Sequence, residues 1–195
     1  MRDLLTKIAL RSDEELMTWL DSNYRNAAIT ELHKRYGNKS LGFFIRMLNG
    51  DTDRAQDLNQ DLFLRILERH KMFNPSFSFY TWLFTIARNM VFTELKKKKK
   101  EIRANDELPM MALQEGDYDK TVFRKQLTSS LNNLSIDHRM AFELRFIQGL
   151  SVKEIAAIVE VPEGTIKSRL YHATNKVSME LKEFYPLNDK LFKLS

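Results

Sequence analysis

Apolar residues recur every three to four positions along most of this chain, a spacing that predicts amphipathic helices. Between residues 12 and 91 they form five successive stripes: Leu16, Trp19 and Leu20; Ile29, Leu32 and Tyr36; Leu41, Phe44, Ile45 and Leu48; Ala55, Leu58, Leu62 and Ile66; Leu83, Ile86, Ala87, Met90 and Val91. Only 6 glycines and 4 prolines occur among 195 residues, which leaves little room for the turns of a β protein. The pattern predicts an all-α fold.

Polar residues and chain breakers mark where the first helices begin and end. Ser12 followed by Glu15 is a capping box, which predicts a helix start at Ser12. Gly37 is the expected C-terminal stop of a helix that begins near Asn26. Asn49-Gly50 is expected to close the helix after that.

A longer helix is predicted from Thr52 to His70, and its apolar stripe leaves a separate polar set facing away from the core. That polar set consists of Asp57, Gln60, Asp61 and Arg65. Two interpretations stay open: a solvated helix face, which is the commoner case, or a docking surface for a basic partner.

Asn74-Pro75 then ends the helical pattern. A loop rich in phenylalanine follows, and after it comes a helix that ends in five consecutive lysines. Lysines in a last helical turn complement the helix dipole, but five exceed that need. Aromatic rings beside a basic helix suit single-stranded nucleic acid, because rings stack on bases and cations follow phosphates. The alternative is that the rings belong to the core, and we expect most of Trp82 and Phe84 to be buried there.

The segment from Ser151 to Tyr171 predicts two helices joined by a tight turn. Ser151 and Glu154 form a second capping box, and the turn Val161-Pro162-Glu163-Gly164 breaks the periodicity before Thr165. The second helix carries a buried stripe: Ile166, Leu170, Ala173 and Val177. A helix-turn-helix of this kind can place its second helix in the DNA major groove, whereas an ordinary helical hairpin would leave the polar face solvated.

The net charge of +5 is unevenly distributed. Residues 88–103 hold seven basic residues against two acidic ones, so this segment carries the whole excess. Residues 51–68 and 104–120 are acidic, and residues 151–183 are balanced. The helix-turn-helix would therefore hold DNA through a few placed groups, which disfavours tight DNA binding by that module alone.

Several kinds of chemistry find no support. The chain has no cysteine for a disulfide or thiolate metal site, and its four histidines (His33, His70, His138 and His172) have no recognised zinc spacing. No phosphate-binding glycine loop or nucleophile motif occurs, so we expect no enzyme, metal or cofactor. Without an apolar run long enough for a membrane span or signal peptide, a cytoplasmic location is expected.

Three segments follow one another in a specific order: AQDLNQDLFLRIL, FSFYTWLFTIARNMVFTELKKKKK and LNNLSIDHRMAFELRFIQGLSVKEIAAIVEVPEGTIKSRLYHAT. This succession resembles bacterial sigma factors of the extracytoplasmic-function type, from about Asn26 to Leu181. The resemblance implies two helical domains, called two and four in the family, joined by a flexible linker. We place domain two at residues 1–100, the acidic linker at 101–120 and domain four at 121–195.

The resemblance also implies roles for individual residues. The segment similar to residues 55–67 docks on core RNA polymerase, which makes Asp57, Gln60, Asp61 and Arg65 the candidate contacts. The loop and helix similar to residues 74–100 recognise and melt the downstream promoter element and capture a flipped base. The candidate residues for this step are Asn74, Ser76, Phe77, Ser78, Arg88, Asn89, Lys96 and Lys97.

The helix similar to residues 164–171 reads the upstream promoter element as duplex. Its candidate contacts are Thr165, Lys167, Ser168, Arg169, Tyr171 and His172. His172 departs from the family, where an arginine is common. The acidic linker would thread toward the polymerase active-site channel, with Asp106, Glu107, Glu115 and Asp117 mimicking nucleic acid.

The resulting hypothesis is a sequence-specific initiation factor that binds core RNA polymerase and promoter DNA. An anti-sigma factor is a further implied partner, one able to hold the protein at the inner membrane. One alternative is a stand-alone helix-turn-helix regulator with a sensing or dimerising N-terminal half. Another is a magnesium-dependent nucleic-acid enzyme using the acids near Asp51 to Asp61. Two interpretations remain for the C-terminal tail: a short capping helix or a contact for a regulator. Its apolar residues include Leu187, Leu191, Phe192 and Leu194.

Overall fold

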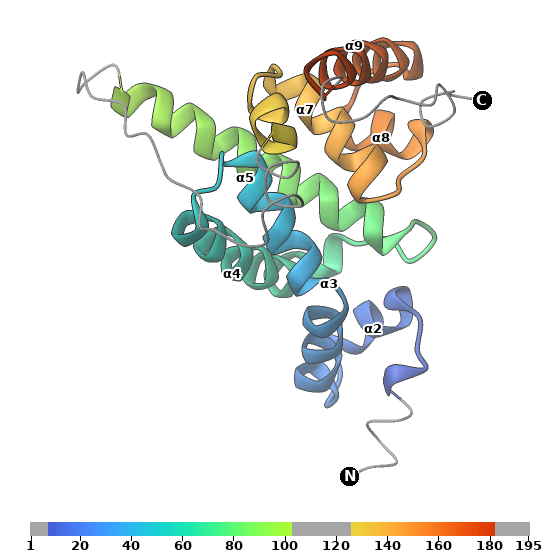
Figure 1. Cartoon of the computed structure of the whole chain (residues 1–195). Helices are drawn as coiled ribbons and strands as arrows, with labels where there is room; N and C mark the ends of the chain where they lie inside the picture. The colour runs from blue at the N-terminus through green and yellow to red at the C-terminus, as the bar shows by residue number, and fades with distance from the viewer. Residues whose placement is uncertain (1–7, 103–125, 182–195) are drawn as a thin grey trace. The chain divides into compact units, whose positions relative to one another are not determined.

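The computed structural model describes residues 8–102 and 126–181 (Figure 1). Within these two ranges the chain forms helices and no strand, which confirms the all-α prediction. The chain divides into two compact units, residues 1–108 (unit 1) and 109–195 (unit 2), and each is described by itself. The predicted linker at 101–120 lies outside the described residues apart from its first two positions, and the predicted tail lies outside them entirely.

Unit 1 is built from helices that pack on one another through their apolar stripes. They are α2 (Asp13–Trp19), α3 (Arg25–Met47), α4 (Thr52–Arg69), a 3-10 turn η1 (His70–Met72) and α5 (Phe79–Ile102). Helix α3 contacts α2, α4 and α5, and it is therefore the central element of the unit. The predicted capping box is present: Ser12 Oγ accepts from the N–H of Glu15 at 3.1 Å, and Ser12 N–H donates to Glu15 Oε2 at 2.9 Å.

The predicted stop at Gly37 is wrong, because α3 continues without a break to Met47. Gly37 is buried, and a Cβ atom there would come within 3.1 Å of the His33 ring. That ring packs on Phe63 of α4 at a centroid distance of 4.6 Å. Tertiary packing against α4 thus outweighs the cost of about 1 kcal/mol that a glycine imposes inside a helix. The predicted end at Asn49-Gly50 is confirmed, since both residues have positive φ.

The core of unit 1 is aromatic. Phe43 of α3 lies edge-on to Phe84 of α5 with centroids 5.3 Å apart, and both rings are completely buried. Phe79 at the start of α5 is also completely buried, and its ring lies 5.4 Å from that of Tyr36. The stripe predicted for α5 is buried along its length, so α5 is held firmly on α3 and α4.

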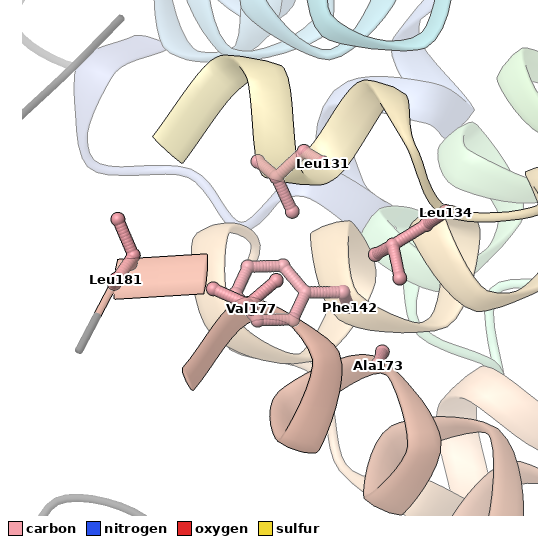
Figure 2. Close-up of a cluster of buried hydrophobic side chains, with 6 residues drawn as sticks. All are labelled: Leu131, Leu134, Phe142, Ala173, Val177 and Leu181. Carbon is pink, nitrogen blue, oxygen red and sulfur yellow. The ribbon is translucent and has the colours of Figure 1, made fainter. Parts of the chain in front are cut away.

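Unit 2 consists of helical residues 126–132, α7 (Ile136–Phe142), a π-helical turn η2 (Glu143–Ile147), α8 (Val152–Val159) and α9 (Glu163–Leu181). Figure 2 shows the apolar cluster that joins the first helix, α7 and α9: Leu131, Leu134, Phe142, Ala173, Val177 and Leu181. The predicted stripe of α9 is buried throughout, and α9 packs on both α7 and α8.

Helix α9 begins at Glu163, two residues before the predicted start at Thr165. The carbonyl of Pro162 accepts from the N–H of Thr165 at 2.9 Å, so the first helical turn already includes Gly164. The reversal between the helices occurs earlier, at Glu160, whose φ of 61° places a residue other than glycine in the left-handed region.

Candidate nucleic-acid and protein interfaces

Helix α4 presents the predicted docking set on its outer face. Asp57, Gln60 and Asp61 are exposed and Arg65 is half-buried, whereas the opposite stripe is in the core. Asp51 caps the helix by accepting from the N–H of Arg54 at 3.1 Å. This arrangement leaves a polar face, and within it two carboxylates, available to a partner.

Arg54 braces this face to α5, a role that the sequence pattern did not suggest. Its guanidinium donates two hydrogen bonds of 2.7 Å to the Glu94 carboxylate and lies 3.4 Å from Asp57. The hydrogen bond from Arg54 lowers the pKa of Glu94, and the same bond raises the pKa of Arg54. A bidentate pair of this kind fixes geometry as well as charge, so the acidic face is held in one orientation.

Leu64 is a residue of this face that sequence reasoning missed. It exposes 56% of its surface and lies four residues after Gln60 and three after Asp61, on the same side of the helix. The signal was present, because Leu64 falls outside the buried stripe of α4. Leu64 thus adds an exposed apolar side chain to the polar face of α4.

The loop of residues 73–78, named the promoter loop here after the role that the resemblance implies, exposes all four residues predicted there. Two of them also organise the loop: Asn74 Oδ1 accepts from the N–H of Ser76 at 3.0 Å, and Ser78 Oγ accepts from the N–H of Thr81 at 3.4 Å. Phe77 exposes 68% of its surface. The loop therefore holds one aromatic ring outward on a turn that polar side chains support.

Phe73 anchors the base of the promoter loop. It is buried, and its ring lies edge-on to Phe79 at 6.1 Å and tilted against Trp82 at 5.4 Å. Phe84 is completely buried and Trp82 is largely so, as predicted. The aromatic residues of this segment thus divide into a buried support and one exposed ring.

The basic side of α5 begins beyond the core. Arg88 is half-buried, donates to Asn89 Oδ1 at 2.8 Å and stacks its guanidinium over the Phe92 ring at 4.7 Å. Asn89, Lys96 and Lys97 are exposed, and the two lysines lie on the last described turns of the helix. Arg88 is therefore a packed cation, whereas the lysines present their charge to solvent.

In unit 2 the capping box of α8 is confirmed, with Ser151 N–H donating to Glu154 Oε2 at 2.8 Å. Helix α9 exposes Lys167, Ser168, Tyr171 and His172, and Thr165 is half-buried. Arg169 differs from these residues, because only 19% of its side chain is exposed and its Nη2 lies 3.5 Å from Asp137 Oδ2 of α7. In this conformation Arg169 links two helices of unit 2 rather than pointing outward.

His138 and His172, which are 34 residues apart, lie side by side with ring centroids 5.9 Å apart. His138 Nδ1 is 2.9 Å from Ser135 Oγ. Burial lowers the pKa of His138, and the neighbouring His172 and Arg169 lower it further. The two rings border a surface pocket of about 720 Å³ whose lining includes Leu134, Asn175 and Lys176.

Residues 8–102 and 126–181 contain no cluster of three or more histidine, aspartate or glutamate side chains placed to hold a metal ion. No helix in the same ranges is both long and apolar enough to cross a membrane.

The chain matches two family models in the order expected from its motifs. The model for sigma-70 region 2 covers residues 32–101, and the model for sigma-70 region 4 covers residues 124–177. The first match covers α4, the promoter loop and α5, and the second covers the helix-turn-helix. A stand-alone regulator with a sensing N-terminal half would not carry region 2.

Known relatives show the same assignment. The chain is 36% identical over 149 residues to the ECF RNA polymerase sigma factor EcfG of Rhodopseudomonas palustris, a match that covers 71% of this chain and 77% of that protein. It is 26% identical over 174 residues to the ECF sigma factor SigW of Bacillus subtilis, covering 80% and 90% of the two chains.

Among solved structures, the sigma factor RpoE in complex with the anti-sigma factor NepR from Bartonella quintana is similar, with a TM-score of 0.66 and 28% identity. That match covers 78% of this chain and 96% of the other. The fold and the two matched regions define a sigma factor of RNA polymerase. The chain belongs to the sigma-70 family, in its extracytoplasmic-function branch.

Proposed function

We propose that this protein directs core RNA polymerase to promoters with two elements and helps to open the DNA there, without bond chemistry of its own. The observation that carries the proposal is the presence, in one chain, of three surfaces that initiation requires. These are the acidic face of α4, the promoter loop together with the basic far end of α5, and the outer face of α9.

Core polymerase docks on the face made by Asp57, Gln60, Asp61, Leu64 and Arg65. Its exposed carboxylates attract a basic partner surface. Leu64 supplies an apolar side chain that becomes buried when the partner binds. The brace from Arg54 to Glu94 holds this face in its orientation before the partner arrives.

The promoter loop takes the melted strand. Phe77 stacks on a base of the non-template strand, Ser76 offers a hydroxyl to the base edge, and Asn74 and Ser78 keep the loop in shape. Lys96 and Lys97 follow the phosphates, with Asn89 beside them, while Arg88 supports the helix surface through Phe92.

Unit 2 reads the upstream element through Lys167, Ser168 and Tyr171, which α9 exposes together, with Thr165 and His172 at the two ends of this surface. Arg169 supports these residues by holding α9 to Asp137 of α7. An anti-sigma factor is a further partner, since the similar structure from Bartonella quintana contains one. We place the protein in the cytoplasm, where its polymerase partner works.

The first experiment is transcription of fragmented bacterial genomic DNA by core RNA polymerase with and without the protein, followed by mapping of RNA 5′ ends. New start sites that share two spaced upstream motifs are the expected result. Unchanged start sites, with active core enzyme and folded protein, would contradict the proposed function.

A charge reversal on α4 tests the docking face. Asp61→Lys is expected to weaken binding to core polymerase by about tenfold or more, because it places a cation where a basic partner surface lands. Asn38→Lys, at another exposed helical position of unit 1, is the matched control and should bind normally. Equal affinity for Asp61→Lys and wild-type protein, measured by titration with labelled core enzyme, would remove α4 from the interface.

A further inference from the structure

The two ends of the promoter loop are each tied to an acidic side chain of the segment that begins with α2. At the first end, the ring of His70 in η1 exposes only 8% of its side chain. Its Nε2 lies 2.8 Å from Asp21 Oδ1, and its Nδ1 lies 2.7 Å from the carbonyl oxygen of Leu67. Both partners are hydrogen-bond acceptors, so each ring nitrogen faces an oxygen atom.

Further charged groups act at this first tie. Lys71 Nζ lies 3.8 Å from the same Asp21 oxygen, and Arg25 adds a weaker attraction. The hydrogen bond from His70 is the main cause that lowers the pKa of Asp21. The carboxylate therefore stays charged and keeps hold of the ring near neutral pH.

The second tie lies where α5 begins. The N–H of Phe79, one of the free donors at the start of this helix, donates to Glu14 Oε1 at 3.0 Å. A carboxylate at this position also interacts favourably with the dipole of the long helix α5. Glu14 lies one residue after Asp13, the first residue of α2.

Helix α2 is itself firmly placed. Asp13 accepts from Arg35 Nη1 of α3 at 2.7 Å and from the Tyr36 hydroxyl, while Leu16 is completely buried. Beside the first tie, an open surface pocket of about 290 Å³ lies where α2 faces the loop, with Met17 and Phe73 among the residues that line it. The two polar ties therefore connect the two ends of the promoter loop to α2 and to the turn after it.

We infer that α2 and the turn after it act as a positioning device for strand capture, in which Asp21 through His70 and Glu14 through the Phe79 backbone hold the promoter loop ready for DNA. The inference rests on the proposed role of the promoter loop. Holding the loop before DNA arrives removes part of the ordering cost of capture, so promoter opening is faster than with an untied loop.

The test uses holoenzyme assembled from core polymerase and full-length variants at a promoter found by the mapping experiment. Glu14→Ala and Asp21→Ala each remove the acceptor of one tie, and the near-isosteric Glu14→Gln keeps an acceptor at the second tie. Asp53→Asn, an exposed carboxylate in the first turn of α4, is the control. Permanganate reactivity of the non-template strand reports opening, and core affinity and protection of the upstream element are measured in parallel.

We expect Glu14→Ala to slow opening by about tenfold, equivalent to about 1.4 kcal/mol in the barrier, with core affinity and upstream protection unchanged. Glu14→Gln alone should retain most of the rate, because its amide oxygen still accepts from Phe79. Asp21→Ala, which removes the acceptor at the first tie, should slow opening as well.

Wild-type opening rates in both Glu14→Ala and Asp21→Ala would overturn the inference. Phe77→Ala separates this failure from failure of the proposed function. If Phe77→Ala opens slowly while the tie variants do not, the ties are wrong and the role of the loop stands. If Phe77→Ala also opens at the wild-type rate, the proposed role of the loop itself fails.

Discussion

Phe77 exposes 68% of its surface, although phenylalanine is among the residue types most often buried. Its neighbour Phe73, four residues earlier, is buried against Phe79 and Trp82. Two phenylalanines of one short loop thus have opposite environments. The exposed ring contributes little to the core, so its effect on function can be separated from its effect on folding.

Replacing Phe77 with alanine should leave the thermal midpoint of unfolding within about 2 °C of wild type, because little apolar contact is lost. Promoter opening, followed by permanganate, should fall by an amount that corresponds to about 1–3 kcal/mol per stacked base. Met72→Ala, which truncates a side chain that is 75% exposed in the adjacent η1 turn, is the control. Normal opening by Phe77→Ala would contradict the stacking role.

The pKa of His138 makes the stability of unit 2 dependent on pH. Burial, His172 and Arg169 lower its pKa from the usual 6.5, so the folded protein binds fewer protons at this site than the unfolded chain does. Stability must therefore fall as the pH drops below about 6.5, because protonation favours the unfolded state. Asp137 acts in the opposite direction but does not reverse the shift.

Urea titrations followed by circular dichroism, at about pH 7.5 and about pH 5.5, test this dependence. Wild-type protein should lose stability at the lower pH, and His138→Gln should lose less. His33→Gln, which removes a histidine from unit 1, should behave as wild type does in the unfolding of unit 2. A His138→Gln variant with the full acid sensitivity of wild type would show that another group is responsible.

Individual residues differ in how well the sequence predicts their role. The caps at Ser12 and Ser151 were predictable because a capping box is local, with both partners three residues apart. The inward placement of Arg169 was not, because its partner Asp137 lies on another helix and no periodicity relates the two. The contact between the rings of His138 and His172 could not be predicted for the same reason, because the two residues lie on different helices.

Among the elements, α3 and α4 share a buried polar contact. Ser40 Oγ donates to Asn59 Oδ1 at 2.6 Å, and both residues are buried. Removing only one partner leaves a buried polar atom without its hydrogen bond, which costs about 1–3 kcal/mol. Removing both partners together avoids that penalty.

We therefore expect Ser40→Ala to lower the free energy of unfolding by about 1–3 kcal/mol. The double variant Ser40→Ala with Asn59→Leu should recover part of that loss, since no unpaired polar group remains. Urea denaturation of the three proteins measures both quantities, and the single variant at Asn59 completes the cycle. Strict additivity of the two single effects would show that the hydrogen bond does not couple the helices.

The helix that the sequence predicted least well is also the one with this contact. Gly37 and the polar Ser40 interrupt the apolar pattern, so the sequence favoured two helices where the protein has one. The packing of His33 on Phe63 and the bond from Ser40 to Asn59 lie between helices, and a periodicity analysis of one segment cannot include them. Helix α4, whose stripe and cap are local, was predicted almost to the residue.

At the scale of the whole molecule, the chain has two compact units with a core in each. Residues 1–108 and 109–195, produced as separate chains, should each be helical and unfold cooperatively. A cut between residues 50 and 51, inside unit 1, is the control and should give fragments without a cooperative transition. Circular dichroism during heating measures this, and a non-cooperative melt of either complete unit would contradict the expectation.

The packing of Trp82 on Phe73 has an optical consequence. Trp82 and Trp19 are the only two tryptophans of the chain, and both belong to unit 1. Emission excited selectively at tryptophan thus originates in unit 1 alone. Because the Trp82 ring packs at a tilt against Phe73, which anchors the promoter loop, the intensity and wavelength of its emission form a label-free signal for a DNA strand that binds this loop as proposed.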